Sequence, residues 1–380
     1  MGIEENSTET EGVLLADGGR YAVFEDSALN RAERGSPVAI APHLEIEAGV
    51  PIDLGTLGGD ESGAAAINPA GQVAGTATNV NGQYRPWRWD GDGPCEFSVL
   101  AGAGNAIGRG IDATGRIVGW CHDNRQGDRA TLWHGGSAIA LTNLVSRGES
   151  QAVALNAAGL IIGNARTERD ERHAVVWRGG QLTDLGTLGG ATSRALALND
   201  AGTIVGVAAT ADGVEQATVW RDGRAAALAI PVSGASRALA INSLGWIVGG
   251  YAAASARWQA SLWVSGKPTT LGTLPGYIGS EATGINATGQ IIGVCWDELG
   301  AERAFLWSTG TLTDLNALLA PGSGWVLDYA SGINDRGQII GCGRFLSQRR
   351  PFLLDLHSQA QAGNVTENQS QMNRSLWSVR

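Results

Sequence analysis

His122 is the residue of this sequence best suited by type to move a proton near neutral pH, because imidazole titrates there. It lies in Trp120-Cys121-His122-Asp123, where a carboxylate such as Asp123 would orient it as a general base. Successive residues of a strand point to opposite faces, which weighs against a pair formed by these two neighbours. A solvated loop histidine is the simpler interpretation. A similar segment, Cys295-Trp296-Asp297-Glu298, makes Trp296 a candidate ligand contact.

Charged and aromatic residues at regular spacing form a second candidate site. Arg194, Arg237, Glu281 and Tyr329 follow one another at intervals of 43, 44 and 48 residues. Two arginines bind a carboxylate or phosphate group through charge-assisted hydrogen bonds, and Glu281 and Tyr329 join His122 as catalytic candidates. The competing interpretation is an ordinary surface ion pair between Arg237 and Glu281, which contributes little energy.

The rest of the inventory argues against several kinds of chemistry. The single lysine, Lys267, follows no glycine-rich phosphate loop, and the five histidines form no H-x-x-x-H or H-E-x-x-H pair. The four cysteines are far apart and form no C-x-x-C, so we interpret them as buried reduced thiols. No G-x-S-x-G motif supports a hydrolase. We therefore expect neither a metal nor a cofactor.

The charge balance bears on the partner. Thirty-seven acidic against 27 basic residues give a formal net charge of −10, which repels nucleic acid and anionic membranes. No apolar run approaches the roughly 18 residues of a membrane span, and the acidic start of the chain lacks the features of a secretory signal. We expect a cytoplasmic protein, exported only if a signal precedes this sequence. Its partner is expected to be a small molecule or a protein, with no nucleic acid and no membrane.

A repeat of about 44 residues organises the chain. An apolar residue, then Asn or Asp, is followed by a glycine three places later and a second glycine seven places later, at intervals of 44, 44, 43, 43, 44 and 48 residues. The repeated position is occupied by Asn68, Asp112, Asn156, Asn199, Asn242, Asn286 and Asn334. A tryptophan stands 21 residues later in six copies, Trp89, Trp133, Trp177, Trp220, Trp263 and Trp307. We assign these tryptophans to the shared core, because a residue found in equivalent places serves the scaffold.

Each repeat is typical of four short strands. A strand ends at the Asn, a tight turn follows, then a β-branched strand, a strand that ends on the tryptophan and a fourth strand. Four strands in about 44 residues is the size of a propeller blade. The sequence therefore predicts an all-β fold, a seven-bladed β-propeller over residues 46–357. A strand at residues 51–57 is predicted to complete the last blade, which ends after its third strand at residues 351–356.

Segments outside the repeat are expected to differ. Residues 1–45 form an N-terminal extension in which residues 13–24 favour a hairpin. Residues 358–380 are polar and are predicted to be disordered. An insertion before the seventh blade, residues 319–329, carries Trp325 and Tyr329, and we predict a ligand lid there.

Residues that break the repeat mark a site at the channel mouth. Five places before each Asn or Asp stand Gly63, Ile107, Gln151, Arg194, Arg237, Glu281 and Tyr329. Arg109 is the one charged residue at its own position, three places before the Asn or Asp, which predicts a channel contact or a buried pair. The predicted ligand-binding set is Arg109, Gln151, Arg194, Arg237, Trp296 and Trp325.

The repeat resembles the bacterial HAF repeat family, named for a His-Ala-Phe signature. The resemblance covers residues 50–356 and is carried by Asp184-Leu185-Gly186-Thr187-Leu188-Gly189-Gly190, the Asn turn, His173-Ala174-Val175-Val176-Trp177 and Arg303-Ala304-Phe305-Leu306-Trp307. The family is described as extracellular repeats, so the resemblance implies an extracellular location.

Two functions are compatible with these observations. The leading hypothesis is a binding or interaction module that uses the channel-mouth face. The alternative is an enzyme of small-molecule metabolism, of the cyclase or lyase type, with its site in the central pocket. Propellers host both, so the fold alone does not choose between them.

Overall fold

The computed structural model describes residues 49–146, 148–253 and 257–356. The predicted N-terminal hairpin and the polar C-terminal tail lie outside the described residues. Within them, no helix is both long and apolar enough to cross a membrane.

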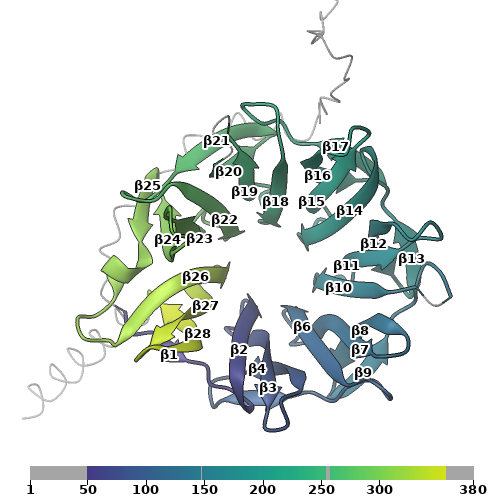
Figure 1. The fold of residues 1–380 in the computed structure, drawn as a ribbon, viewed down its shortest axis with the longest axis horizontal. Coiled ribbons are helices and arrows are strands. Elements are labelled where there is room, and N and C mark those ends of the chain that lie inside the picture. Colours follow the sequence, from purple (N-terminus) through teal and green to yellow (C-terminus); the bar gives the residue numbers. More distant parts are fainter. Residues whose placement is uncertain (1–48, 147, 254–256, 357–380) are drawn as a thin grey trace, which may run out of the picture. The chain divides into compact units, whose positions relative to one another are not determined.

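Seven four-stranded antiparallel sheets, the blades, stand around a common centre (Figure 1). This confirms the predicted seven-bladed β-propeller. Blade one comprises β2 (Gly58–Ile67), β3 (Val73–Asn79), β4 (Tyr84–Trp89) and β5 (Pro94–Glu96). Blade two comprises β6 (Asn105–Ile111), β7 (Ile117–Asp123), β8 (Gly127–His134) and β9 (Ser137–Ala140). Blade three comprises β10 (Ser150–Leu155), β11 (Ile161–Arg166), β12 (Arg172–Arg178) and β13 (Gln181–Asp184).

Blades four to six have the same order. They comprise β14 (Gly189–Leu198), β15 (Ile204–Thr210), β16 (Glu215–Arg221) and β17 (Arg224–Ala227); β18 (Ser236–Ile241), β19 (Ile247–Ala252), β20 (Trp258–Val264) and β21 (Lys267–Gly272); β22 (Gly279–Ile285), β23 (Ile291–Trp296), β24 (Glu302–Ser308) and β25 (Thr311–Asp314), followed by the 3₁₀ helix η2 (Leu315–Leu318).

Blade seven closes the ring with strands from both ends of the described chain. β26 (Trp325–Ile333), β27 (Gln338–Phe345) and β28 (Gln348–Asp355) are joined by β1 (Ile52–Asp53). Ile52 lies opposite Leu353 and Asp53 opposite Phe352, so the predicted closure by the N-terminal strand is confirmed. The exposed edge of β28 is thereby paired, which removes a template for aggregation.

Each of the two repeated positions requires glycine for a different physical reason. The first, three residues after the Asn, has a φ between 77° and 87° in all seven blades, a conformation that favours glycine. The second lies in the second strand with an ordinary φ. At Gly163 a Cβ would stand 1.9 Å from the backbone oxygen of Gln151. In every other blade, a Cβ on the equivalent glycine would stand about 2 Å from the backbone oxygen at the equivalent position. The innermost strand therefore leaves no room for a side chain there.

The repeated Asn side chains link neighbouring blades. The Asn68 Nδ2 donates to the backbone oxygen of Asp112 at 2.9 Å, and Asn334 closes the circle by donating to the backbone oxygen of Asn68 at 3.1 Å. Asn156, Asn199, Asn242 and Asn286 donate in the same way to the blade that follows. Each Asn is buried, so these bonds satisfy polar atoms that water does not reach.

The tryptophan positions behave as core in four blades. Trp133, Trp177, Trp220 and Trp263 are all at most 2% exposed, and three of them donate their indole N–H to a backbone oxygen. In blades one and six, Trp89 and Trp307 are only half-buried. The fully buried aromatic rings there are Trp87 and Phe305, two residues earlier, which pack over the second glycine of the repeat.

Trp325 of the insertion before blade seven is part of the core, which corrects the expectation that it forms a lid. Trp325 begins β26, is 7% exposed and stacks on Phe345 with ring centroids 5.0 Å apart. Together with Leu315 from η2 and Phe352 it fills the space between blades six and seven. An indole buried in this way cannot cover a ligand at the mouth.

Candidate functional site

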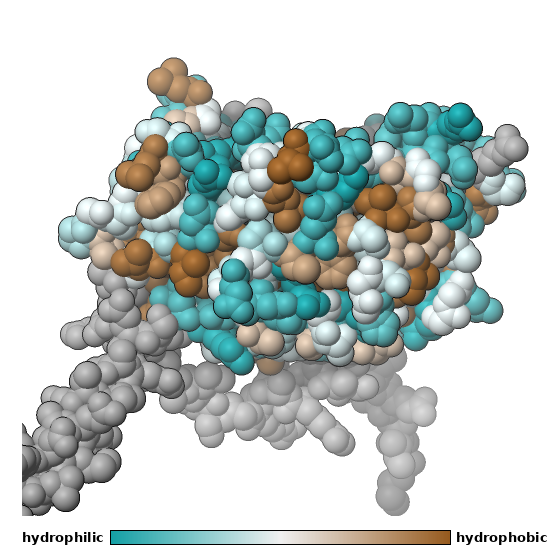
Figure 2. Space-filling view, turned by 90° about the horizontal axis from the view of Figure 1, so that it is seen from below, coloured by the Kyte–Doolittle hydropathy of each residue, from teal (hydrophilic) through white to brown (hydrophobic). Residues whose placement is uncertain are grey.

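One end of the ring carries the loops between second and third strands and the connections between blades. The innermost strands begin at this end, so the positions five residues before each Asn surround the channel there. The outer wall of the ring offers no large apolar surface in the view of Figure 2, which shows mostly hydrophilic side chains with apolar ones singly or in small groups among them. Scattered apolar residues of this kind are normal on a folded protein.

A central cavity of about 920 Å³ opens among the innermost strands. Its deeper level is formed by the residues three places before each Asn, where every innermost strand has a register shift against its neighbour. These seven residues all line the cavity: Ala65, Arg109, Val153, Leu196, Leu239, Thr283 and Ser331. Arg109, predicted to make a channel contact or a buried pair, is thus among the lining residues.

The level nearer the mouth is asymmetric. Gly63 has no side chain there, and a Cβ built on it would meet only the Cys342 Sγ, at 3.9 Å. Gly63, Ile107 and Tyr329 line the cavity, whereas Gln151, Arg194, Arg237 and Glu281 do not. The cavity therefore opens on the side of blades seven, one and two.

The two arginines predicted to bind an anion are already paired with carboxylates. Arg194 donates to both carboxylate oxygens of Glu215, at 3.1 and 3.0 Å. Arg237 lies 3.6 Å from the Glu281 carboxylate and 4.3 Å above the Trp258 ring. The competing interpretation of an ion pair between Arg237 and Glu281 is correct, and the structure does not join Arg194 and Arg237 into one anion site.

Glu281 and Tyr329 lie in surroundings that disfavour their charged forms. Burial raises the pKa of Glu281, although the nearby Arg237 charge acts in the opposite direction. Its Oε1 is buried with no hydrogen bond within the described part of the chain. Burial, followed by the charge of Glu281, raises the pKa of Tyr329 to about 12, while Arg109 lowers it. Tyr329 therefore keeps its proton at neutral pH and can donate a hydrogen bond.

His122 has a carboxylate partner, but not the one next to it in sequence. Its Nδ1 lies 2.8 Å from the Asp128 Oδ1, because His122 in β7 and Asp128 in β8 are direct cross-strand partners. Asp123 instead accepts a hydrogen bond from the Arg125 backbone N–H. Strand alternation rightly excluded Asp123, while the hairpin register that selects Asp128 was not visible in the sequence.

A polar chain continues from this dyad into blade three. The Gln151 Nε2 donates to the Asp128 Oδ2 at 2.5 Å, and the Arg172 guanidinium donates to the Gln151 Oε1 at 3.1 Å. Glu149 lies 3.8 Å from Arg172. Gln151 therefore binds neighbouring protein groups and is placed to hold Asp128 rather than to contact a ligand.

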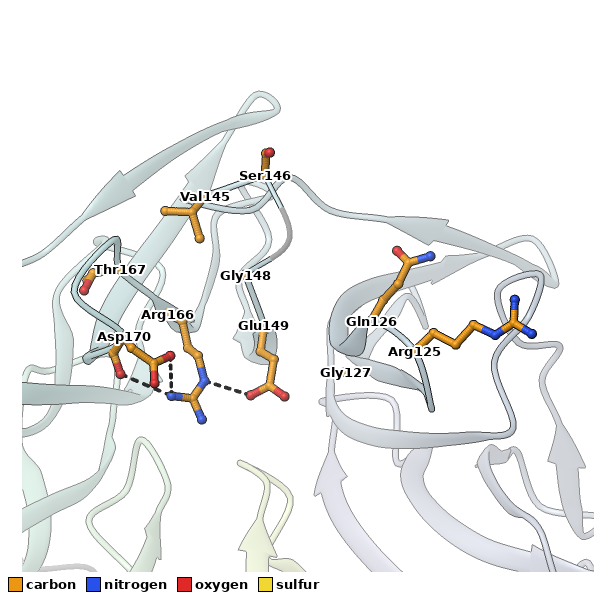
Figure 3. Close-up of a pocket in the computed structure, with 10 residues that line it drawn as sticks. All are labelled: Arg125, Gln126, Gly127, Val145, Ser146, Gly148, Glu149, Arg166, Thr167 and Asp170. Atoms are coloured by element: carbon orange, nitrogen blue, oxygen red, sulfur yellow. Dashed lines mark hydrogen bonds and ion pairs between the residues drawn. The ribbon is translucent and has the colours of Figure 1, made fainter.

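A second hollow of about 720 Å³ lies beside this chain (Figure 3). Arg166 in it donates to Glu149 at 3.0 Å and to Asp170 at 2.8 Å, and Gly127 packs against the Glu149 side chain. The Arg125 side chain points away from that group in Figure 3. Within this hollow, the Arg166 charge is paired with Glu149 and Asp170. The hollow is therefore a weaker candidate for a ligand site than the central cavity.

The remaining predicted contact, Trp296, packs flat against the backbone of Gly279, where a Cβ would meet its ring at 2.5 Å. It does not line the central cavity. Sequence reasoning missed Arg349, which lines the cavity and donates to the Cys342 sulfur. A signal was present, since the residue five places before the tryptophan position varies between blades. These residues are Tyr84, Asp128, Arg172, Glu215, Trp258, Glu302 and, counted from Leu354, which takes the tryptophan position in the register of blade seven, Arg349. Several partners of the ring residues come from this position.

Comparisons with known proteins bear on the fold. No protein-family model matches the chain, and no curated protein is similar in sequence. A puromycin-hydrolyzing peptidase of Mycobacterium tuberculosis is similar over 82% of this chain and 54% of its own, with 13% identity and a TM-score of 0.56. A mutant puromycin hydrolase complexed with PGG matches 79% of this chain and 53% of its own, with 16% identity and a TM-score of 0.55.

The SapL1 lectin in complex with α-methyl fucoside is more distant, with 13% identity, a TM-score of 0.42 and coverage of 70% of this chain and 98% of its own. The chain spans about half the length of the puromycin-hydrolyzing peptidase and of the puromycin hydrolase. At these identities the likeness to these two proteins shows the propeller fold and nothing of their activity.

Proposed function

We propose that this protein is a ligand-binding propeller that takes a small molecule into the central cavity. The observation that carries the proposal is the cavity of about 920 Å³ that opens beside Gly63. Its volume lies in the range of small-molecule sites, and its deeper level combines apolar side chains with a few polar groups, the usual composition of such a site.

Closing the cavity tests the proposal. Gly63→Phe would place a ring in the opening, where a side chain has space, and Gly104→Phe provides a matched control. Gly104 is an exposed glycine outside the cavity lining, and a Cβ there would meet no atom within 4 Å. In a thermal-shift screen of metabolites, a ligand at about 100 times its Kd stabilises by about 2.7 kcal/mol. We expect such hits with the wild type and with Gly104→Phe, but not with Gly63→Phe.

If no compound raises the melting temperature of the wild type, or if Gly63→Phe responds like the wild type, the central cavity is not a ligand site. Partner proteins at the mouth would then be the better explanation.

An enzyme of small-molecule metabolism is the second candidate, supported by the pair of His122 and Asp128. A carboxylate on Nδ1 leaves Nε2 as the proton acceptor, the usual arrangement of a general base. Incubating any stabilising compound with the wild type and with His122→Ala, followed by mass spectrometry, separates the candidates. A binding protein leaves the compound unchanged in both, whereas an enzyme converts it only with His122 present.

A further inference from the structure

The arginines of the ring differ in whether a carboxylate neutralises them. Arg194 and Arg237 at the mouth pair with Glu215 and Glu281. Arg109 lines the cavity and is exposed to it, and it has no hydrogen bond or ion pair to any described residue. Its guanidinium donors are therefore available to a ligand, and they are fixed in number and always charged.

The surroundings of Arg109 contain no carboxylate at the same level of the channel. The other residues three places before the Asn are apolar or carry a hydroxyl. Both hydroxyls are already used: Thr283 donates to the Ala330 backbone oxygen at 2.7 Å and Ser331 to the Ala64 backbone oxygen at 2.9 Å. The acidic residues that line the cavity, Asp60 and Glu61, lie at the start of β2, nearer the mouth.

Depth separates these acids from Arg109. Glu61 stands seven residues before its Asn and Arg109 three, so the four residues between these levels correspond to about 13 Å along the channel at the usual rise of a strand. Glu61 also accepts the Tyr84 hydroxyl at 2.6 Å. The mouth thus carries Asp60 and Glu61 together with the basic Arg349, whereas Arg109 is the one charged residue at the deeper level.

The three blades that follow blade two are apolar at that level. Val153, Leu196 and Leu239, from three consecutive blades, line it. Tyr329 adds a hydroxyl that makes no hydrogen bond to the described residues and lies close enough to Arg109 to be affected by its charge. The cavity thus offers the Arg109 and Tyr329 donors in blades two and seven, a further donor at Arg349 in blade seven, and an aliphatic surface over blades three to five.

From this arrangement, and resting on the proposed function, we infer that the ligand is an organic anion with an apolar body. Its acidic group binds the Arg109 guanidinium and the Tyr329 hydroxyl, and its apolar part packs on Val153, Leu196 and Leu239. Charge-assisted hydrogen bonds of this type are about twice as strong as neutral ones, so they set the preference for an anion.

Two fluorescent probes of similar shape test the charge. One is the anion 8-anilinonaphthalene-1-sulfonate, and the other is the neutral N-phenyl-1-naphthylamine. We expect both to bind the wild type at about one per chain, and decanoate to displace the anionic probe. Arg109→Met should weaken the anionic probe about tenfold, the effect of losing one hydrogen bond to a charged group, and leave the neutral probe within about twofold. Arg125→Met, an exposed arginine of the same blade outside the central cavity, is the control and should change neither.

The outcomes separate this inference from the proposed function. Equal loss of both probes in Arg109→Met, or no loss of either, overturns the preference for an anion. Binding of neither probe to the wild type, or binding that survives Gly63→Phe, overturns the central site itself.

Discussion

The Asn that ends each innermost strand has two roles, and Asp112 can perform only one of them. In Asn68 the Oδ1 accepts from backbone N–H groups of its own turn and the Nδ2 donates to the next blade. The Asp112 carboxylate accepts in the same turn, from Thr114 and Arg116, but has no hydrogen to donate. It binds the Arg116 guanidinium instead, at 2.6 Å.

The ionised form of Asp112 is therefore expected to stabilise the fold in a pH-dependent way. Burial alone would raise its pKa, but hydrogen bonds from Thr114 and Arg116 and the Arg116 charge outweigh it and lower the pKa below the ordinary value of 3.8. A lowered pKa of an acid means that its stabilisation is full well above pH 3.8 and is lost as the pH falls through the folded value.

Urea unfolding of the wild type and Asp112→Asn at pH 7, 5 and 3 measures this effect. We expect the free energy of unfolding of the wild type, relative to the variant, to fall between pH 5 and pH 3. Asp92→Asn, at an exposed turn carboxylate, should show no such change. A difference between wild type and Asp112→Asn that is constant with pH would contradict the expectation.

His173 forms a contact between two strands of its blade. His173 Nδ1 lies 2.8 Å from Asp184 on the neighbouring outer strand. The equivalent pairs in three other blades are Arg85 with Glu96, Arg303 with Asp314 and Arg350 with Asp53. In these four blades a basic side chain and an acid therefore join strands three and four at equivalent positions.

At the scale of strands, a serine in blades three to six joins each of these blades to the one before it. Ser193 Oγ accepts the Ala174 backbone N–H at 2.9 Å and donates to the Gly186 backbone oxygen at 2.6 Å. Ser150, Ser236 and Ser280 accept from Ala130, Ala217 and Ala260 in the same way. Blade seven has Pro351 at the position of these alanines, and proline has no N–H. The Ser62 hydroxyl of blade one is correspondingly buried without a hydrogen bond to the described residues.

The same substitution should therefore have opposite consequences in two blades. Ser193→Ala leaves a buried N–H and a partly buried carbonyl without partners and should cost about 1–3 kcal/mol in the free energy of unfolding. Ser62→Ala removes an unpaired hydroxyl and should be neutral or slightly stabilising. Chemical denaturation of both variants measures the difference. Equal losses would show that the hydrogen bonds of Ser193 do not matter for stability.

Strands and turns were predictable from the sequence because each is set locally, by β-branched runs and by the Asn and glycine of each turn. The packing of side chains was less so. Register shifts in the innermost strands aim Val153, Leu196 and Leu239 into the cavity, and nothing in their residue types marks a bulge. In blades one and six the buried ring belongs to Trp87 and Phe305, two residues before the expected tryptophan. Residues two apart lie on the same face of a strand, so the sequence pattern does not distinguish the two positions. Trp325 was mistaken for a lid because an insertion rich in glycine is typical of a surface loop.

For the whole molecule, closure of the ring was predictable because an incomplete last repeat and a spare first strand complement each other. The site was predictable only in part. Arg109 and Tyr329 were expected at the cavity. The pairing of Arg194 with Glu215 was not, because these residues lie on different strands and are 21 residues apart in the sequence. The side on which the cavity opens follows from an absent side chain, at Gly63, which a search for chemically active residues passes over.

Closure rests on few residues, so it makes a sharp prediction about stability. β1 has only two residues in its ladder, but Leu54, which follows it, is 1% exposed and packs with Val73 and Trp87 of blade one and Leu353 of blade seven. Its backbone N–H donates to the Pro351 oxygen at 3.1 Å. Leu54 therefore joins the first blade to the last.

Leu54→Ala should cost about 2–5 kcal/mol in the free energy of unfolding, the usual range for a leucine removed from a core. Ile52→Ala in the same strand is the control, because Ile52 is 46% exposed and should cost less than about 1 kcal/mol. Hydrogen exchange adds a spatial test: in Leu54→Ala, protection should fall first in β28 and β2, on either side of the junction. Uniform loss of protection around the ring, or equal effects of the two substitutions, would mean that the seam is no weaker than any other contact between blades.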